Sequence, residues 1–99
     1  MIINKIEENK NLILIPEGRL DAITSTQLQD ALIPAFDTAK EVKLDFSKIE
    51  YISSAGLRVL LIGQKAANSK GASMLLCSVS EEIMEVLKMT GFTDMLTIV

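Results

Sequence analysis

Two adjacent serines, Ser53 and Ser54, stand where a strand-like run passes into a helix-like run, in the segment DFSKIEYISSAGLRVLL that begins at Asp45. A serine that opens a helix commonly accepts a hydrogen bond from a free backbone N–H of the first turn, which stabilises the helix by roughly 1 kcal/mol. One hydroxyl is enough for that purpose, and Ala55 and Gly56 keep the next residues small. We therefore expect a second hydroxyl and the backbone to be open to an approaching partner.

The other residues exclude several kinds of active site. The chain has no histidine, which removes the commonest general base near neutral pH and every zinc site that depends on imidazole. Its five glycines never fall into the spacing of a phosphate-binding loop, so no cofactor is expected. Asp21 and Asp45 each follow a strand and could form an acid–base pair, but aspartate there more often serves in turns or caps. We therefore predict that the protein is not an enzyme and holds no metal, with the aspartate pair as the competing hypothesis.

Composition and charge limit the possible partners. The 99 residues suffice for one domain, which we place over residues 1–99, and 48% are hydrophobic. The net charge is −3 and the ten Lys and Arg are scattered, so nucleic acid is not an expected partner. No apolar stretch approaches the roughly 18 residues of a membrane span. The lone cysteine, Cys77, lies in an apolar run and is expected to be an inert core thiol. We expect a cytoplasmic protein that is not inserted in a membrane.

Strand and helix patterns alternate along the chain. IINKIEE and NLILIPEGRL predict a hairpin with its turn near residues 9–11, and EVKLDF, SMLLCSV and MLTIV predict three further strands. Three helices are expected between them: one capped by Thr24, Ser25 or Thr26 and ended near Pro34, one from Ser54 to Gly71, and one from Ser80 to Gly91. The residues predicted to face inward on these helices are Ile23, Leu28, Leu32 and Ile33; Leu57, Leu60, Leu61, Gln64 and Ala67; and Ile83, Val86, Leu87 and Met89. Met74, Met84, Met89 and Met95 are expected to fill gaps in the core.

This order, β-β-α-β-α-β-α-β, predicts the fold class. Strands that alternate with helices become parallel neighbours through right-handed crossovers, whereas the initial hairpin adds an antiparallel edge. We therefore predict a single α/β domain with a mixed, mostly parallel sheet and helices packed on it.

Three segments resemble the STAS family, in particular its anti-sigma factor antagonists. The serine-containing segment D-F-S-K-I-E-Y-I-S-S-A-G-L is similar to the phosphorylation-loop signature of that family. E-G-R-L-D at Glu17 to Asp21 is similar to the family's G-x-L-D, and Ile83 to Phe92 provides the closing I-x-x-V-L-K-M-T-G-F. The three segments occur in the expected order and span nearly the whole chain, so the resemblance implies a STAS-type domain.

The resemblance also implies a switch controlled by phosphorylation. In this family the modified residue lies two positions before the glycine, which is Ser54 here. A serine kinase that is also the anti-sigma factor phosphorylates it, a PP2C-type phosphatase restores it, and only the unmodified form binds the kinase and frees the sigma factor. Many antagonists carry Asp just before the modified serine, whereas this chain has Ser53, which is therefore the second candidate.

The partner surface is expected around this serine. We predict that it includes Asp21, Ser47, Ser53, Ser54, Ala55, Gly56 and Arg58. The alternative is a STAS subunit of another assembly, such as a lipid-transporting ABC system, which would use the same helix face constitutively and without phosphorylation.

Overall fold

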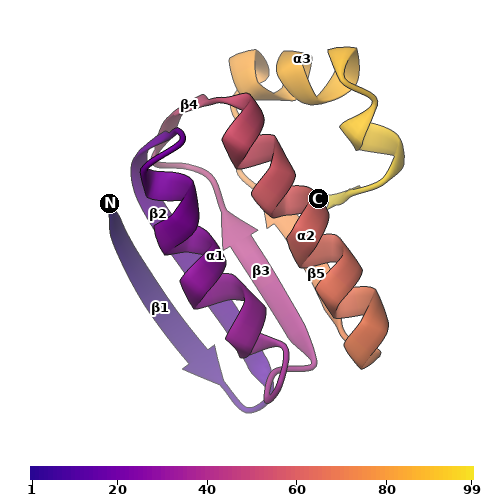
Figure 1. Ribbon diagram of the computed structural model, residues 1–99. Helices are drawn as coiled ribbons and strands as arrows, with labels where there is room; N and C mark the ends of the chain where they lie inside the picture. Colours follow the sequence, from indigo (N-terminus) through magenta and orange to yellow (C-terminus); the bar gives the residue numbers. More distant parts are fainter.

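The chain begins with an antiparallel hairpin, as the sequence predicts. In the computed structural model, which describes residues 1–99, β1 (Ile2–Glu8) pairs with β2 (Asn11–Leu20) (Figure 1). The turn between them places Asn9 in the left-handed region at φ 57°. Asn tolerates that conformation better than most residues, because its short polar side chain can bond locally.

The remaining elements confirm the predicted α/β class. They are α1 (Thr24–Ala35), β3 (Glu41–Asp45), β4 (Ile49–Ile52), α2 (Ser54–Lys70), β5 (Ser73–Cys77), α3 (Glu81–Met89), the 3-10 turn η1 (Phe92–Asp94) and β6 (Thr97–Ile98). The main sheet has the order β1-β2-β3-β5-β6, and β4 pairs with β2. Every pairing except the hairpin is parallel. The predicted element order therefore holds, with one strand more than expected.

The additional strand is β4, and it pairs with the end of β2. The first part of β2, from Asn11 to Leu14, pairs with β3, and Gly18 to Leu20 pair with β4 after a register irregularity between Gly18 and Arg19. Gly18 has a φ of 107°, which side chains of L residues rarely adopt. The change of neighbour therefore occurs at a glycine, and it brings the end of β4 beside the end of β2.

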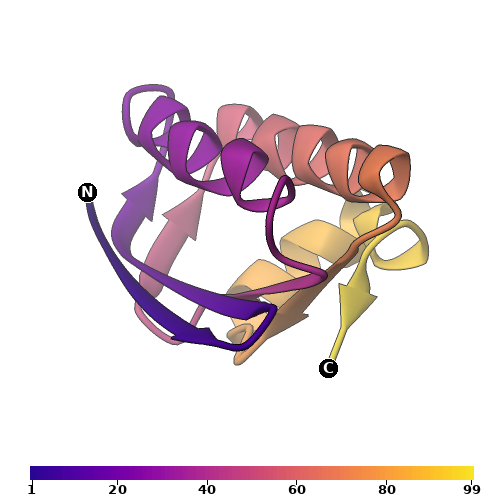
Figure 2. The same cartoon turned by 90° about the horizontal axis from the view of Figure 1, so that it is seen from below.

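Helices α1 and α2 lie side by side over one face of the sheet (Figure 2). The hydrophobic core of the domain is made of leucines and other apolar side chains, including Leu14, Leu44 and Leu76 from strands, Phe46 directly after β3, Leu28 and Leu32 from α1, Leu60 from α2 and Leu87 from α3. Ser80 caps α3, since its Oγ accepts a hydrogen bond from the Ile83 N–H at 3.2 Å. No helix combines the length and the apolar character that crossing a bilayer requires.

The buried face of α2 agrees with the prediction only at Leu60 and Ala67. It consists of Gly56, Val59, Leu60, Gly63 and Ala67, whereas Leu57, Leu61 and Gln64 are only partly buried. The small residues allow the helix to approach α1 and the sheet closely: a Cβ added at Gly63 would lie 2.6 Å from Leu32 Cδ2. The spacing of large apolar residues therefore predicted the wrong centre for the contact of α2 with α1 and the sheet.

Several other predicted core residues lie at the surface. Ile23 and Met89 are each 79% exposed, and Met95 is 38% exposed. Ile23 precedes the first turn of α1 and Met89 is the last residue of α3, where a helical period no longer fixes which way a side chain faces. Of the four methionines expected in the core only Met74 is fully buried, and Cys77 is a free, partly buried thiol.

Candidate functional site

The ends of β2 and β4 lie next to each other, and each strand leads into a helix. Leu20 pairs with Ile52 in a parallel register, and the Ser53 N–H donates a hydrogen bond to the Leu20 carbonyl at 2.9 Å. Asp21 follows Leu20 directly, just as Ser53 follows Ile52. The fold therefore brings Asp21 and the serine pair, which are distant in sequence, to the same edge of the sheet.

The two serines have different environments. Ser53 is the N-cap of α2: its extended backbone precedes the helix, and its Oγ accepts a hydrogen bond from the Gly56 N–H at 3.4 Å. Ser54 is the first residue of α2, its side chain is exposed, and its hydroxyl has no hydrogen-bond partner in the chain. The capping role thus belongs to Ser53, and the Ser54 hydroxyl is available for chemistry.

Gly56 holds the start of α2 against the two strand ends. It is buried, and a Cβ added there would lie 2.8 Å from Ile52 Cγ1, 2.9 Å from Leu20 Cγ and 3.0 Å from the Leu20 carbonyl oxygen. Real Cβ atoms essentially never lie within 3.0 Å of another atom, so a larger residue would force the neighbouring side chains or the helix to move. The position of Ser54 therefore depends on this contact.

Asp21 organises the turn that leads into α1. Its Oδ1 accepts hydrogen bonds from the backbone N–H groups of Thr24 and Ile23, both at 3.0 Å, and from the Thr24 hydroxyl at 3.1 Å. The bond from the Thr24 N–H, with those from Ile23 and the Thr24 hydroxyl and the charge of Arg19, lowers the pKa of Asp21 against an opposing effect of desolvation. The carboxylate therefore orders the turn before α1, in keeping with the turn or capping role that is commonest for aspartate at such a position. The predicted capping of α1 by Thr24, Ser25 or Thr26 is wrong, because the helix begins at Thr24 and none of the three caps it.

This hydrogen bonding predicts a contribution of Asp21 to acid stability. Because the folded-state pKa is depressed, the contribution is complete above the unfolded-state pKa and is lost as pH falls through the folded value. Asp21→Asn keeps the acceptor oxygen but does not titrate, so its free energy of unfolding should fall less steeply on acidification. Urea denaturation at a series of pH values, from neutral to about pH 2, measures these slopes.

A matched variant separates this effect from general acid denaturation. Asp30→Asn makes the same change of charge at an exposed residue of α1 and serves as the control for the loss of one carboxylate. Equal slopes for Asp21→Asn and wild type would contradict the assignment.

Two arginines lie at this end of the molecule, and they are the only arginines of the chain. Arg58 is exposed on α2 one turn after Ser54 and forms no ion pair within the chain. Arg19 lies over the ring of Tyr51, 4.2 Å from its centroid, and Tyr51 is 42% exposed. Sequence analysis did not identify the contact between Arg19 and Tyr51, because this contact depends on the register between β2 and the unpredicted β4.

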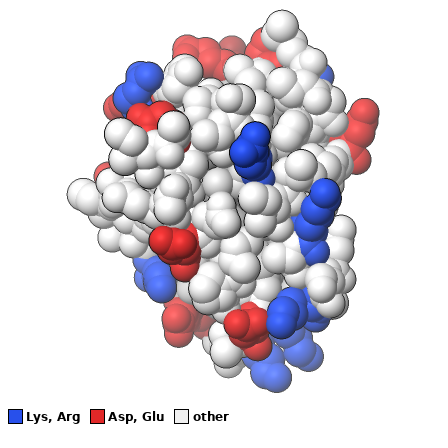
Figure 3. Space-filling model, in the orientation of Figure 1, with Lys and Arg blue, Asp and Glu red and all other residues white.

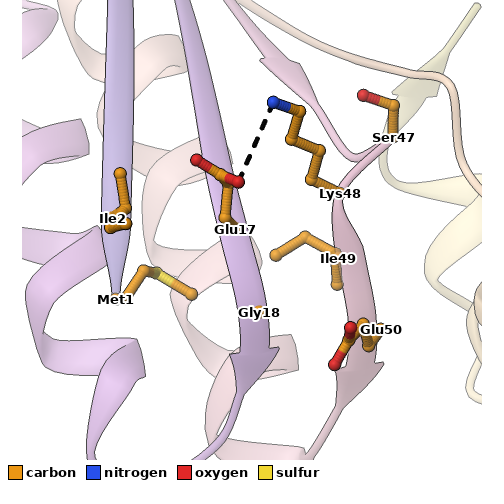
Figure 4. Close-up of a pocket in the computed structure, with 8 residues that line it drawn as sticks. All are labelled: Met1, Ile2, Glu17, Gly18, Ser47, Lys48, Ile49 and Glu50. Atoms are coloured by element: carbon orange, nitrogen blue, oxygen red, sulfur yellow. Dashed lines mark ion pairs between the residues drawn. The ribbon is translucent and has the colours of Figure 1, made fainter.

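The structure places Ser47 away from the other predicted residues. Ser47 lies in the turn before β4, whereas Ser53 follows the end of β4, and the four residues of that strand span about 13 Å. Around Ser47 is an open depression of about 670 Å³ that also contains the Glu17–Lys48 ion pair, whose charged atoms are 3.8 Å apart (Figure 4). A partner that contacts Ser47 as well as Ser53 and Ser54 must extend along β4. The role of Ser47 in partner binding therefore stays a prediction.

The aspartates that could have formed an acid–base pair are both engaged in their own turns. Asp45 Oδ1 accepts a hydrogen bond from the Ser47 N–H at 2.9 Å, in the same way that Asp21 accepts from Ile23. No three acidic or thiol side chains lie close enough to hold a metal ion. The structure thus accounts for both carboxylates through backbone hydrogen bonds.

Comparison with known proteins places the chain in a family. The family model described as the STAS domain matches residues 3–99. The chain belongs to the STAS domain family. BtrV of Bordetella bronchiseptica, named as an anti-sigma factor antagonist, is 33% identical over 82 residues, which cover 82% of this chain and 71% of BtrV. The anti-sigma-B factor antagonist of Bacillus subtilis is 24% identical over 94% of this STAS domain and 86% of its own length.

Solved structures have the same fold. A protein of Thermotoga maritima, described as an anti-sigma factor antagonist, superimposes with a TM-score of 0.89 at 21% identity, covering 97% of this STAS domain and 84% of that chain. SpoIIAA in its unphosphorylated form superimposes with a TM-score of 0.78 at 13% identity, covering 99% of this domain and 87% of SpoIIAA. At these identities the structural similarity establishes the fold alone. The function has to be argued from the residues of the site.

Proposed function

We propose that this STAS domain is an anti-sigma factor antagonist whose binding is controlled by phosphorylation of Ser54. In its unmodified form it binds an anti-sigma factor that is also a serine kinase, and the sigma factor is released. A PP2C-type phosphatase returns the phosphorylated form to the binding state in the cytoplasm. The proposal gives the domain a regulatory role in transcription without catalysis of its own.

The observation that carries the proposal is the free hydroxyl at the start of α2. Ser53 already satisfies the helix cap, so the exposed Ser54 hydroxyl can be modified without loss of a structural hydrogen bond. The neighbouring residues are small, with Ala55 partly buried and Gly56 buried, which leaves room for a kinase active site around the serine. The names of the relatives BtrV and the anti-sigma-B factor antagonist agree with this role.

The position of Ser54 also favours a modification that does not unfold the domain. A phosphoserine carries a charge of about −1.5 to −2 at pH 7. Free N–H groups and the helix dipole stabilise an anion at a helix start by about 0.3–1 kcal/mol. In agreement, SpoIIAA in its phosphorylated form superimposes on this chain with a TM-score of 0.77, close to the 0.78 of its unphosphorylated form.

The proposal is tested with the anti-sigma factor kinases encoded in the source genome. Each kinase is incubated with the chain, ATP and magnesium, and the intact mass of the chain is measured. We expect one added phosphate on wild type and on Ser53→Ala, and none on Ser54→Ala. The Ser53→Ala variant is the matched control, because it removes the adjacent hydroxyl and costs only the cap, about 1 kcal/mol.

The outcomes decide between the alternatives that the sequence left open. Phosphate on Ser54→Ala but not on Ser53→Ala would assign the switch to Ser53. If no kinase modifies or binds any form, the phosphorylation switch is wrong, and a constitutive STAS subunit of another assembly becomes the better interpretation.

A further inference from the structure

The outward face of α2 carries a row of side chains that the fold does not use. Ser54, Arg58, Leu61 and Lys65 follow the spacing i, i+4, i+7, i+11, which places them on one side of a helix. Ser54, Arg58 and Lys65 are exposed and Leu61 is partly exposed, and the buried residues of α2 occupy the opposite side. At 1.5 Å per residue this α2 row is about 16 Å long.

The charges on this helix are of one sign. α2 contains no Asp or Glu, although the whole chain has a net charge of −3. Lys70 is paired with Asp37, with 3.1 Å between the charged atoms, whereas Arg58 and Lys65 form no ion pair within the chain. Figure 3 shows Lys and Arg side chains along the path of α2 with no acidic side chain between the upper two. Two unpaired cations thus flank an apolar side chain on a surface that begins at the modified serine.

We propose that the anti-sigma factor lies along the whole α2 row, with carboxylates opposite Arg58 and Lys65 and an apolar patch on Leu61. This inference rests on the proposed function and extends the partner surface two turns beyond Arg58. An apolar contact with a charged rim is the usual composition of such interfaces, and opposite charges across them set specificity and the rate of encounter. The same carboxylates would repel a phosphate on Ser54, so the row also explains why phosphorylation would release this partner.

The test compares charge reversals at two places. Lys65→Glu and Leu61→Gln alter the far half of the α2 row, and Lys5→Glu makes the same change of charge on the exposed edge strand β1. Binding of each variant to the kinase that modifies Ser54 is measured by calorimetry at two salt concentrations. We expect Lys65→Glu and Leu61→Gln each to weaken binding about tenfold or more, and Lys5→Glu to stay within about twofold. The affinity of Lys65→Glu should also depend less on salt than that of wild type.

Three results would overturn the inference. If Lys65→Glu and Leu61→Gln bind as wild type while Ser54→Asp binds weakly, the contact ends near the serines and only the extended surface is wrong. If Lys5→Glu weakens binding as much as Lys65→Glu, net charge and not the α2 row is responsible. If the kinase binds no form of the chain, the proposed function fails as well. Melting temperatures of the free variants verify that each one is folded.

Discussion

Phosphorylation of Ser54 is expected to lower the affinity of this STAS domain for its anti-sigma factor by about a hundredfold or more, while the domain stays folded. A partner that closes over the start of α2 must remove water from a dianion. At an effective dielectric constant of 20, a like-charge pair about 4 Å apart costs about 4 kcal/mol. Because about 1.4 kcal/mol is a tenfold change in affinity, one such contact is sufficient.

The measurement is a titration of the kinase with four forms of the chain: unmodified wild type, phosphorylated wild type, Ser54→Asp and Ser54→Asn. Enzymatically phosphorylated wild type should bind most weakly, and Ser54→Asp, which carries one negative charge, should bind about tenfold or more weakly than wild type. Ser54→Asn is the control, since it has nearly the shape of aspartate without the charge, and it should bind more tightly than Ser54→Asp. Equal affinities of Ser54→Asp and Ser54→Asn would show that size and not charge disrupts binding. Unfolding of the phosphorylated chain would refute a switch that acts on the interface alone.

Gly56→Val is expected to lower the free energy of unfolding by about 3 kcal/mol, which is the upper end of the usual cost of overpacking a core. The first added carbon already meets the Leu20 carbonyl oxygen at 3.0 Å, and that atom belongs to the backbone of β2 and cannot rotate away. Gly56→Ala should cost less, because the better helix propensity of alanine offsets about 1 kcal/mol of the strain. Both changes should also weaken binding of the anti-sigma factor, because α2 must shift and Ser54 moves with it.

The comparison variant for this prediction is Gly63→Ala in the same helix. It gains the same helix propensity, but its Cβ meets Leu32 Cδ2 and Met74 Sδ, which are the ends of side chains that can rotate. Urea denaturation should therefore rank the variants as Gly63→Ala, Gly56→Ala and Gly56→Val, from most to least stable. A Gly56→Ala variant as stable as wild type would mean that the start of α2 can move without cost.

The features that the sequence predicts best are local ones. Helix α2 ends at Gly71, which adopts a left-handed conformation with φ 69°, and α3 begins after the Ser80 cap. Both signals are encoded within a few neighbouring residues. The hairpin was predictable for the same reason, since two apolar strands flank a short polar turn. The family signature added the expectation for Ser54.

The features that sequence analysis missed depend on distant contacts. β4 has only four residues and is held by β2, which is more than twenty-five residues earlier in the chain, so no local pattern identifies it. The buried face of α2 centres on glycines, which count as weak signals in a search for apolar periodicity. The different roles of Ser53 and Ser54 follow from where α2 begins, and element boundaries are the least certain part of such a prediction.

The capping bond of Ser53 shows that this position can hold the start of α2 without the aspartate that the family resemblance leads one to expect. Aspartate and serine are both strong N-cap residues, so position 53 can carry either and keep the same first turn. They differ in their effect on an adjacent phosphate, whose second ionisation occurs near pH 6. A carboxylate beside it would raise that pKa by repulsion, whereas the neutral Ser53 leaves a larger fraction of the phosphate doubly ionised at neutral pH. If Ser54 is phosphorylated as we propose, the cap residue thereby tunes how much charge the phosphate carries.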